Sequence, residues 1–186
     1  MMDNFYKTYY DEYFKLMFTE DIEKKFEEFK KLAISIKSNK NKLIFAGNGA
    51  SASISAHGAV DFTKQAGVRS VTFSDANMIT AFSNDYGYDN WMAKALDFYS
   101  NTGDVLVLTS VSGESPSVVL AAQRAKKLGI KVVTFSGRSS KNSLKRLGDI
   151  NFWVDSNAYN IVECIHMMWI TTVVDSVIGK SEYEVS

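Results

Sequence analysis

Residues 104–135 read DVLVLTSVSGESPSVVLAAQRAKKLGIKVVTF, and this stretch decides the fold. Two apolar runs, 104–109 and 131–135, enclose the segment Pro116–Leu128, whose apolar residues recur at helical spacing. Short runs rich in Val and Leu are typical of buried strands. A strand, a helix and a second strand in this order predict a βαβ unit with parallel strands.

The same order repeats on both sides of this stretch. Strand-like runs occur at 42–46, 69–73 and 150–154, and helical spacing occurs at 51–66, 90–99 and, more weakly, 142–147. Continuous apolar strands need helices over both faces of their sheet. We therefore predict an α/β fold, a three-layer α-β-α sandwich around a five-stranded, mostly parallel sheet with right-handed crossovers.

The first 40 residues follow a different pattern. Between Asp21 and Ile36, apolar residues fall three or four positions apart, which predicts an amphipathic helix. The segment before it is rich in aromatic residues: Phe5, Tyr6, Tyr9, Tyr10, Tyr13, Phe14 and Phe18. We predict that residues 1–40 form a helical extension that packs against another subunit, and that 41–186 complete one structural domain. The alternative is that the extension only covers its own domain.

The composition of the chain limits the classes of function and partner that it favours. The chain has 186 residues with 21 basic and 21 acidic side chains, so charge favours neither nucleic acid nor a membrane surface as a partner. The single Cys164 and the lack of a signal-peptide pattern lead us to expect a cytoplasmic protein. The apolar stretch 161–178 contains Glu163, His166 and Asp175, so we expect a core or interface helix there rather than a membrane span.

Two loops that follow predicted strands can bind a ligand, because ligands of such sheets bind beyond the carboxyl ends of the strands. Residues 45–53, FAGNGASAS, place bare backbone at a strand–helix turn. They also match G-x-G-x-x-A, a weak dinucleotide fingerprint, which leaves an NAD(P)-dependent enzyme as one alternative.

The second loop, residues 109–117, reads TSVSGESPS. Ser115 is suited to the N-cap of a helix and Pro116 to its first position. Free backbone N–H groups at this helix start, with the hydroxyls of Ser110, Ser112 and Ser115, predict a phosphate cradle. The alternative is an ordinary capped turn.

Together with NDYG at 84–87, the two loops resemble the sugar isomerase (SIS) domain, particularly its phosphoheptose isomerase branch. Members of that branch are tetramers with an N-terminal helical extension, and they convert sedoheptulose 7-phosphate into a heptose phosphate for lipopolysaccharide or capsule. The resemblance implies that a sugar phosphate binds here. It places the phosphate on Ser110, Ser112 and Ser115, and the sugar near Asn48, Gly49, Ser51, Asn84 and Asp85.

Aldose–ketose isomerisation needs an acid and a base beside the sugar carbonyl. The two histidines each have a nearby carboxylate: His57 and Asp61 are four apart, and Glu163 and His166 are three apart, so each pair shares a helix face. We predict these four as catalytic residues. The alternative is that each pair is structural, its members satisfying one another.

In the branch that the chain resembles, a His, a Glu, a Gln and a second His can hold zinc. Those positions correspond here to His57, Asp61, Val162 and Ile170. Valine and isoleucine cannot bind a metal, so we expect no metal and no cofactor. His166 lies on the same helix face as positions 162 and 170, from which its imidazole could act on the sugar.

Two functions follow from these residues. The first is a sugar-phosphate isomerase with altered catalytic and zinc residues. The second is a phosphosugar-binding regulator or assembly protein without turnover. The Ser-rich second loop argues against the third alternative, the dinucleotide-dependent enzyme.

Overall fold

A five-stranded sheet forms the centre of the computed structural model, which describes residues 4–184. The strand order is β2-β1-β3-β4-β5, and every neighbouring pair is parallel. The α/β sandwich is confirmed, with a sheet that is parallel throughout. The strands are β1 (Leu43–Gly47), β2 (Ser70–Thr72), β3 (Val105–Ser110), β4 (Lys131–Ser136) and β5 (Ile150–Trp153).

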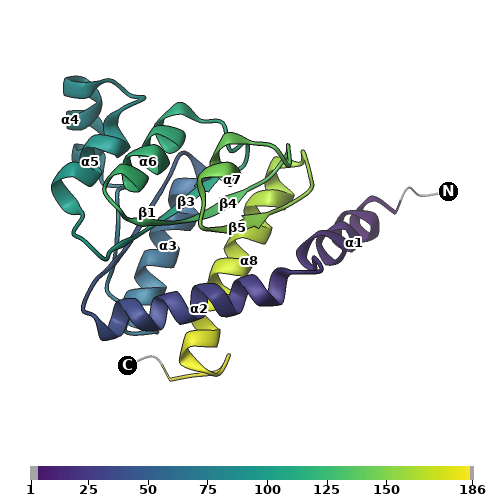
Figure 1. Cartoon of the computed structure of the whole chain (residues 1–186). Coiled ribbons are helices and arrows are strands. Elements are labelled where there is room, and N and C mark those ends of the chain that lie inside the picture. Colours follow the sequence, from purple (N-terminus) through teal and green to yellow (C-terminus); the bar gives the residue numbers. More distant parts are fainter. Residues whose placement is uncertain (1–3, 185–186) are drawn as a thin grey trace.

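Helices cover both faces of the sheet (Figure 1). They are α1 (Phe5–Met17), α2 (Ile22–Ser38), α3 (Ala50–Lys64), α4 (Ala76–Tyr86), α5 (Trp91–Tyr99), α6 (Pro116–Lys127), α7 (Ser143–Leu147) and α8 (Tyr159–Ile178). Successive strand side chains point to opposite faces. Phe45 and Val107 therefore join the core beneath α2, α3 and α8, while Ile44 and Leu106 join the core beneath α5 and α6.

The predicted N-terminal extension consists of two helices with different surroundings. Helix α2 belongs to the core, since Phe29 is fully buried among the rings of Phe62, Phe135 and Phe152. Helix α1 has no buried residue and projects beyond the sandwich (Figure 1). Residues 1–3 of the predicted extension and 185–186 of the predicted domain lie outside the described residues.

Helix α8 is the predicted apolar C-terminal helix, and it is a core helix. Eight of its 20 residues are buried, and it packs against α2 and α3. Within residues 4–184 it alone is long and apolar enough to cross a membrane. Its buried face against the sheet fits a soluble protein instead.

Helix α4 is absent from the sequence-based prediction. Asp75 caps it, accepting hydrogen bonds from the backbone N–H groups of Asn77 (2.9 Å) and Met78 (3.1 Å). None of its residues is fully buried, but Met78, Ile79 and Phe82 pack partly against the core. The cap and this short apolar spacing were the local signals for the helix.

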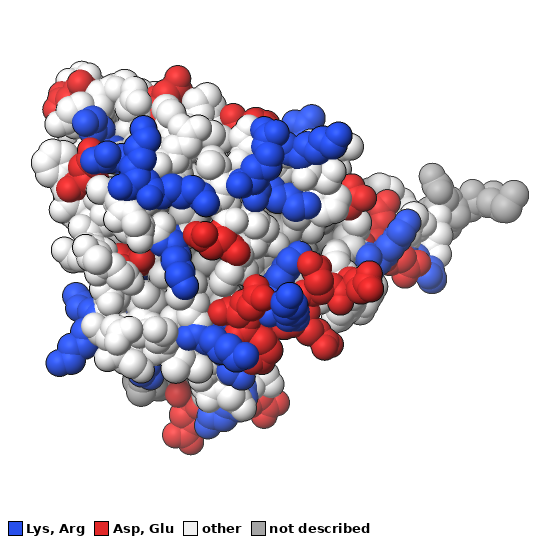
Figure 2. Space-filling view, in the orientation of Figure 1, with Lys and Arg blue, Asp and Glu red and all other residues white. Residues whose placement is uncertain are grey.

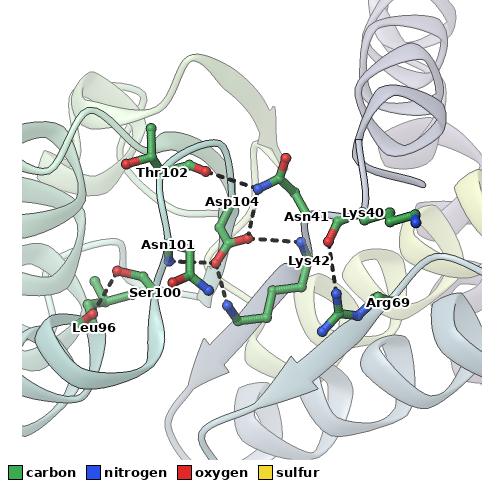
Figure 3. Close-up of polar contacts among 9 residues, drawn as sticks. All are labelled: Lys40, Asn41, Lys42, Arg69, Leu96, Ser100, Asn101, Thr102 and Asp104. Atoms are coloured by element: carbon green, nitrogen blue, oxygen red, sulfur yellow. Dashed lines mark hydrogen bonds and ion pairs between the residues drawn. The ribbon is translucent and has the colours of Figure 1, made fainter. Parts of the chain in front are cut away.

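Charged side chains are distributed unevenly over the face shown in Figure 2. Lys and Arg gather over α5, α6 and α7, whereas α2 carries both signs side by side. One ionic cluster is internal: Asp104, at the start of β3, accepts hydrogen bonds from the backbone N–H groups of Lys42 and Asn101 and pairs with the Lys42 ammonium (Figure 3). This cluster joins β1 and β3 at the end of the sheet opposite the ligand loops.

Candidate functional site

A cleft of about 280 Å³ opens where β1 and β3 end. Its walls come from the two predicted ligand loops and from the first turns of α8. The lining residues are Asn48, Gly49, Ala50, Ser51, Thr109, Ser110, Val111, Ser112, Ser115, Tyr159 and Glu163. The structure therefore brings together six of the eight predicted substrate-binding residues.

The predicted phosphate cradle lies at the start of α6. Ser115 occupies the N-cap and Pro116 follows it, but the Ser115 hydroxyl does not cap the helix. It lies instead 3.5 Å from the hydroxyl of Ser110 at the end of β3. The helix N–H groups and both hydroxyls are thus directed to a common space, which suits a phosphate.

Gly113 gives the cradle loop its shape. Its φ is +64°, and its N–H donates to the Ser110 hydroxyl over 3.3 Å. A side chain at this position would collide with the carboxamide of Asn142. That buried carboxamide donates to the Ser136 hydroxyl over 3.1 Å, so the cradle rests directly on the end of β4.

The first loop presents Asn48 and Ser51 to the cleft. Asn48 donates to the Ser117 hydroxyl over 3.0 Å and accepts from the Tyr88 phenol over 3.1 Å. These bonds tie the loop to α6 and to the turn after α4. Gly49, with φ +56°, begins α3 without a side chain, which leaves the backbone open to a ligand.

Thr109 is a cleft residue that the sequence analysis did not single out. Its side chain is buried, and its hydroxyl has no hydrogen-bond partner among the described residues. Buried hydroxyls normally have partners, and this one belongs to a residue of the cleft lining. Its position beside Ser110, at the end of a predicted strand, was the signal in the sequence that could have identified it as a cleft residue.

Glu163 lines the cleft from α8, and Tyr159 lies one turn before it. Glu163 is the only carboxylate among the described cleft residues. Tyr159 was not predicted, because its exposure depends on where α8 begins relative to β5. The two side chains place one carboxylate and one phenol beside the loops that can hold a phosphate.

His166 does not line the cleft. It is fully buried, with Nε2 3.1 Å from the backbone carbonyl oxygen of Ser136. A carbonyl can only accept, so Nε2 carries the proton. Burial lowers the pKa of His166 to about 4, which keeps the ring neutral at neutral pH.

The predicted His57–Asp61 contact is present, with 3.1 Å between Nε2 and Oδ2. The pair lies on α3 outside the cleft lining, and the His57 side chain is 55% exposed. Asp61 follows Ala50 by 11 residues, which is about 16 Å along the helix. His57 and Asp61 therefore lie about 10 and 16 Å along α3 from the first ligand loop of the same chain.

Asn84 and Asp85 also lie outside the cleft. They are exposed at the end of α4, where the Asn84 amide donates to Asp85 over 2.9 Å. Tyr88, three residues after Asp85, is the side chain from this region that contacts a cleft residue.

The residues at the positions that can hold zinc in the branch do not fit the ion. Val162 and Ile170 are fully buried, Val162 over Gly137 and Ile170 over Gly58. Within the part of the chain that the structure describes, no three His, Cys, Asp or Glu side chains come together as a metal site. His57 and Asp61 therefore have no further ligands beside them.

Comparisons with known proteins agree with this geometry. Residues 8–137 match the family model of the SIS domain. The phosphoheptose isomerase of Aliarcobacter butzleri is 31% identical over 160 residues, which is 83% of this chain and 84% of the relative. That of Helicobacter pylori strain P12 is 32% identical over 152 residues, covering 78% and 79%.

Solved structures share the fold. The phosphoheptose isomerase GmhA of Neisseria gonorrhoeae superposes with a TM-score of 0.83 and 24% identity, covering 95% of this chain and 98% of its own. The phosphoheptose isomerase of Francisella tularensis gives 0.76 and 24%, over 84% of this chain and 86% of its own.

Proposed function

The chain belongs to the SIS domain family and to its phosphoheptose isomerase branch, and on that premise we propose that it interconverts a ketose and an aldose phosphate of the sedoheptulose 7-phosphate type. The observation that carries the proposal is the cleft itself. It combines a phosphate cradle, an unpartnered buried hydroxyl on Thr109 and the carboxylate of Glu163. We expect the protein in the cytoplasm, supplying heptose for a surface polysaccharide.

The cradle binds the phosphate end of the sugar. The N–H groups at the start of α6 donate to phosphate oxygens, and the helix dipole favours the negative charge. The hydroxyls of Ser110, Ser112 and Ser115 add donors around the same space. These hydrogen bonds to the phosphate hold the sugar carbonyl at a fixed distance from the cradle.

Glu163 moves the proton. As a carboxylate it removes the proton on the carbon beside the carbonyl, while the carbonyl oxygen takes a proton from water to give the enediol. As the acid it then donates a proton to the former carbonyl carbon, while the hydroxyl of the neighbouring carbon releases its proton to water and becomes the new carbonyl. The Tyr159 phenol can donate a hydrogen bond to the sugar oxygens during this transfer. His166 lies behind them, where its bond to the Ser136 carbonyl ties α8 to the end of β4, the strand that pairs with the cradle strand β3.

His57 and Asp61 are the second candidate acid–base pair. They lie about 10 to 16 Å along α3 from the first ligand loop, so they act on the sugar only if its chain extends down this helix or if a second subunit brings its own pair to the cleft. Mixed assemblies of Glu163→Gln and Asp61→Asn chains distinguish these cases. Recovered activity in the mixture indicates a site shared between subunits.

Incubation with sedoheptulose 7-phosphate, followed by NMR detection of the aldose phosphate, tests the proposal. We expect product from the wild type, and a loss of about 100-fold or more in kcat for Glu163→Gln with little change in KM. Fructose 6-phosphate and ribulose 5-phosphate are matched controls for chain length. Binding of all three without turnover of any would favour the second function, a phosphosugar-binding regulator or assembly protein.

A further inference from the structure

The cleft has an unbalanced charge once a phosphate is bound. A phosphate monoester carries about −1.5 to −2 charges at neutral pH, whereas a helix N-terminus offers about +0.5. Glu163 adds a further negative charge, and of the 11 described residues that line the cleft none is a lysine or arginine. A cation close to the cradle would therefore strengthen the binding of the phosphate.

A second cavity, the rim pocket, adjoins the cradle. It measures about 440 Å³ and is lined by Ser112, Glu114, Arg138, Ser139 and Asn157. Ser112 lines both cavities, so the rim pocket opens directly beside the predicted phosphate position.

Arg138 is the cation of the rim pocket. Its guanidinium lies 6.0 Å from the ring centre of Tyr159, a cleft residue, and its Nε donates weakly to Asn157 over 3.4 Å. Among residues 4–184 no carboxylate forms an ion pair with it. Glu114, on the same pocket, is instead engaged by the backbone N–H of Ser143 at 2.8 Å.

The backbone holds Arg138 in place at a cost. Its φ is +56°, a left-handed conformation that disfavours side chains other than glycine. Lys40, the other described non-glycine residue with positive φ, follows the end of α2, where such a conformation is common. Arg138 follows a strand, so helix termination does not account for it.

Neighbouring contacts fix this conformation. The Arg138 N–H donates to the Ser156 carbonyl over 3.0 Å. The buried Asn142 carboxamide donates to the carbonyls on either side, those of Gly137 and Ser139. A strained residue that its surroundings hold on several sides is typical of a functional position.

We propose that Arg138 is the counter-ion of the bound phosphate, turning across Tyr159 from the rim pocket to the Ser112 side of the cradle. This inference rests on the proposed function, since it assigns the charge that the phosphosugar site lacks. The guanidinium fork carries a positive charge and can pair two phosphate oxygens at once, whereas each serine hydroxyl is neutral and donates one hydrogen bond.

Calorimetric titration of the full chain with sedoheptulose 7-phosphate tests the proposal. We expect Arg138→Gln to weaken binding about tenfold or more and to raise KM with kcat nearly unchanged. Arg138→Lys should recover part of the affinity, because it restores the charge without the fork. Arg69→Gln, the same change of charge at the opposite end of the sheet, is the matched control and should bind as the wild type does.

Arg138→Gly separates charge from folding. Glycine accepts the positive φ, so this variant should fold at least as stably as the wild type while binding as weakly as Arg138→Gln. Equal affinities of the wild type, Arg138→Gln and Arg138→Gly overturn the inference.

Inorganic phosphate, titrated as a second probe, separates this inference from the proposed function. Phosphate binding that weakens in Arg138→Gln, with no binding of sedoheptulose 7-phosphate, supports the counter-ion and contradicts the proposed substrate. If the wild type binds neither probe, both are overturned.

Discussion

His166 shows how burial decides the role of a residue. In the sequence it is one of two histidines with a neighbouring carboxylate, a pattern that suggests catalysis. In the structure its ring contacts Phe135 and Trp169, and only Nε2 has a polar partner. Its pKa is lowered because the protonated ring would be desolvated in this core.

The lowered pKa of His166 predicts a stability that depends on pH. The unfolded chain binds the proton near pH 6.5 and the folded chain only near 4. The contribution of neutral His166 is therefore complete above about pH 6.5 and is lost as the pH falls through about 4. Between pH 7 and pH 5 we expect this residue to lower the free energy of unfolding by about 2 kcal/mol.

Urea unfolding at both pH values measures this effect. His166→Gln can still donate to the Ser136 carbonyl but does not titrate, so its stability should change less between pH 7 and pH 5 than that of the wild type. An equal change in both proteins would show that His166 is not buried in neutral form.

Two loop glycines provide a matched pair of predictions. Gly49 and Gly113 both have positive φ, but a side chain meets open space at Gly49 and the Asn142 carboxamide at Gly113. Gly49→Ala should lower the free energy of unfolding by about 1 kcal/mol from backbone strain. Gly113→Ala adds the collision and should cost about 2–4 kcal/mol. Urea denaturation compares them, and equal losses would contradict the tight contact under the cradle.

At the scale of elements, sequence reasoning was accurate where each signal was local. The five strands were predicted to within one or two residues. The central strands β1, β3 and β4 are almost continuously buried, whereas edge strand β2, Ser70–Thr72, has no buried residue. The start of α6 was predicted for a similar reason, because Ser115 and Pro116 mark it in the sequence itself.

Other features of the site depend on packing between elements. Glu163 faces the cleft and His166 faces the core. Which residue faces which way depends on the orientation of α8 about its own axis against the sheet, and the periodicity of the sequence does not give this orientation. Rim-pocket residue Arg138 was missed for the same reason. Its position follows from contacts with Ser156 and Asn142, which are 18 and 4 residues away in the chain.

The Asp104 cluster, which joins the starts of β1 and β3, predicts a measurable contribution to the stability of the sheet. Asp104→Asn leaves the largely buried Lys42 ammonium without its carboxylate partner. We therefore expect the free energy of unfolding to fall by about 3 kcal/mol. Asp97→Asn is the control, since its pairs with Lys94 and Arg124 lie at the surface and should contribute less than about 1 kcal/mol. Similar losses in the two variants would show that the cluster is no tighter than a surface pair.

At the scale of the whole molecule, the exposed aromatic surface of α1 is the feature that the packing of a single chain does not explain. Its outer side exposes Phe5, Tyr6, Tyr10 and Phe14, and Phe18 follows it, each at least 60% accessible. Tyr9 and Tyr13 turn inward to the core, and the carbonyl of Met17 accepts from Trp169 over 3.1 Å, which anchors the helix to α8. Such an apolar surface on an anchored helix is typical of a subunit contact.

We predict that α1 assembles the protein into a homo-oligomer, a tetramer or a dimer. The double substitution Tyr10→Ser, Phe14→Ser should lower the mass measured by light scattering during gel filtration. Phe98→Ser removes an equally exposed ring on α5 and should leave the mass unchanged. A wild type that is monomeric at micromolar concentration would contradict this role of α1.

Proton transfer in the cleft is the central claim, and NMR of sedoheptulose 7-phosphate turnover in D₂O tests it most directly. A carboxylate base that works through an enediol exchanges with solvent, so we predict an aldose phosphate with deuterium at the carbon that receives the proton. Glu163→Gln should form neither product nor deuterated ketose at a comparable rate. Folded wild type that binds the sugar phosphate, yet yields no aldose and exchanges no deuterium, would contradict the account.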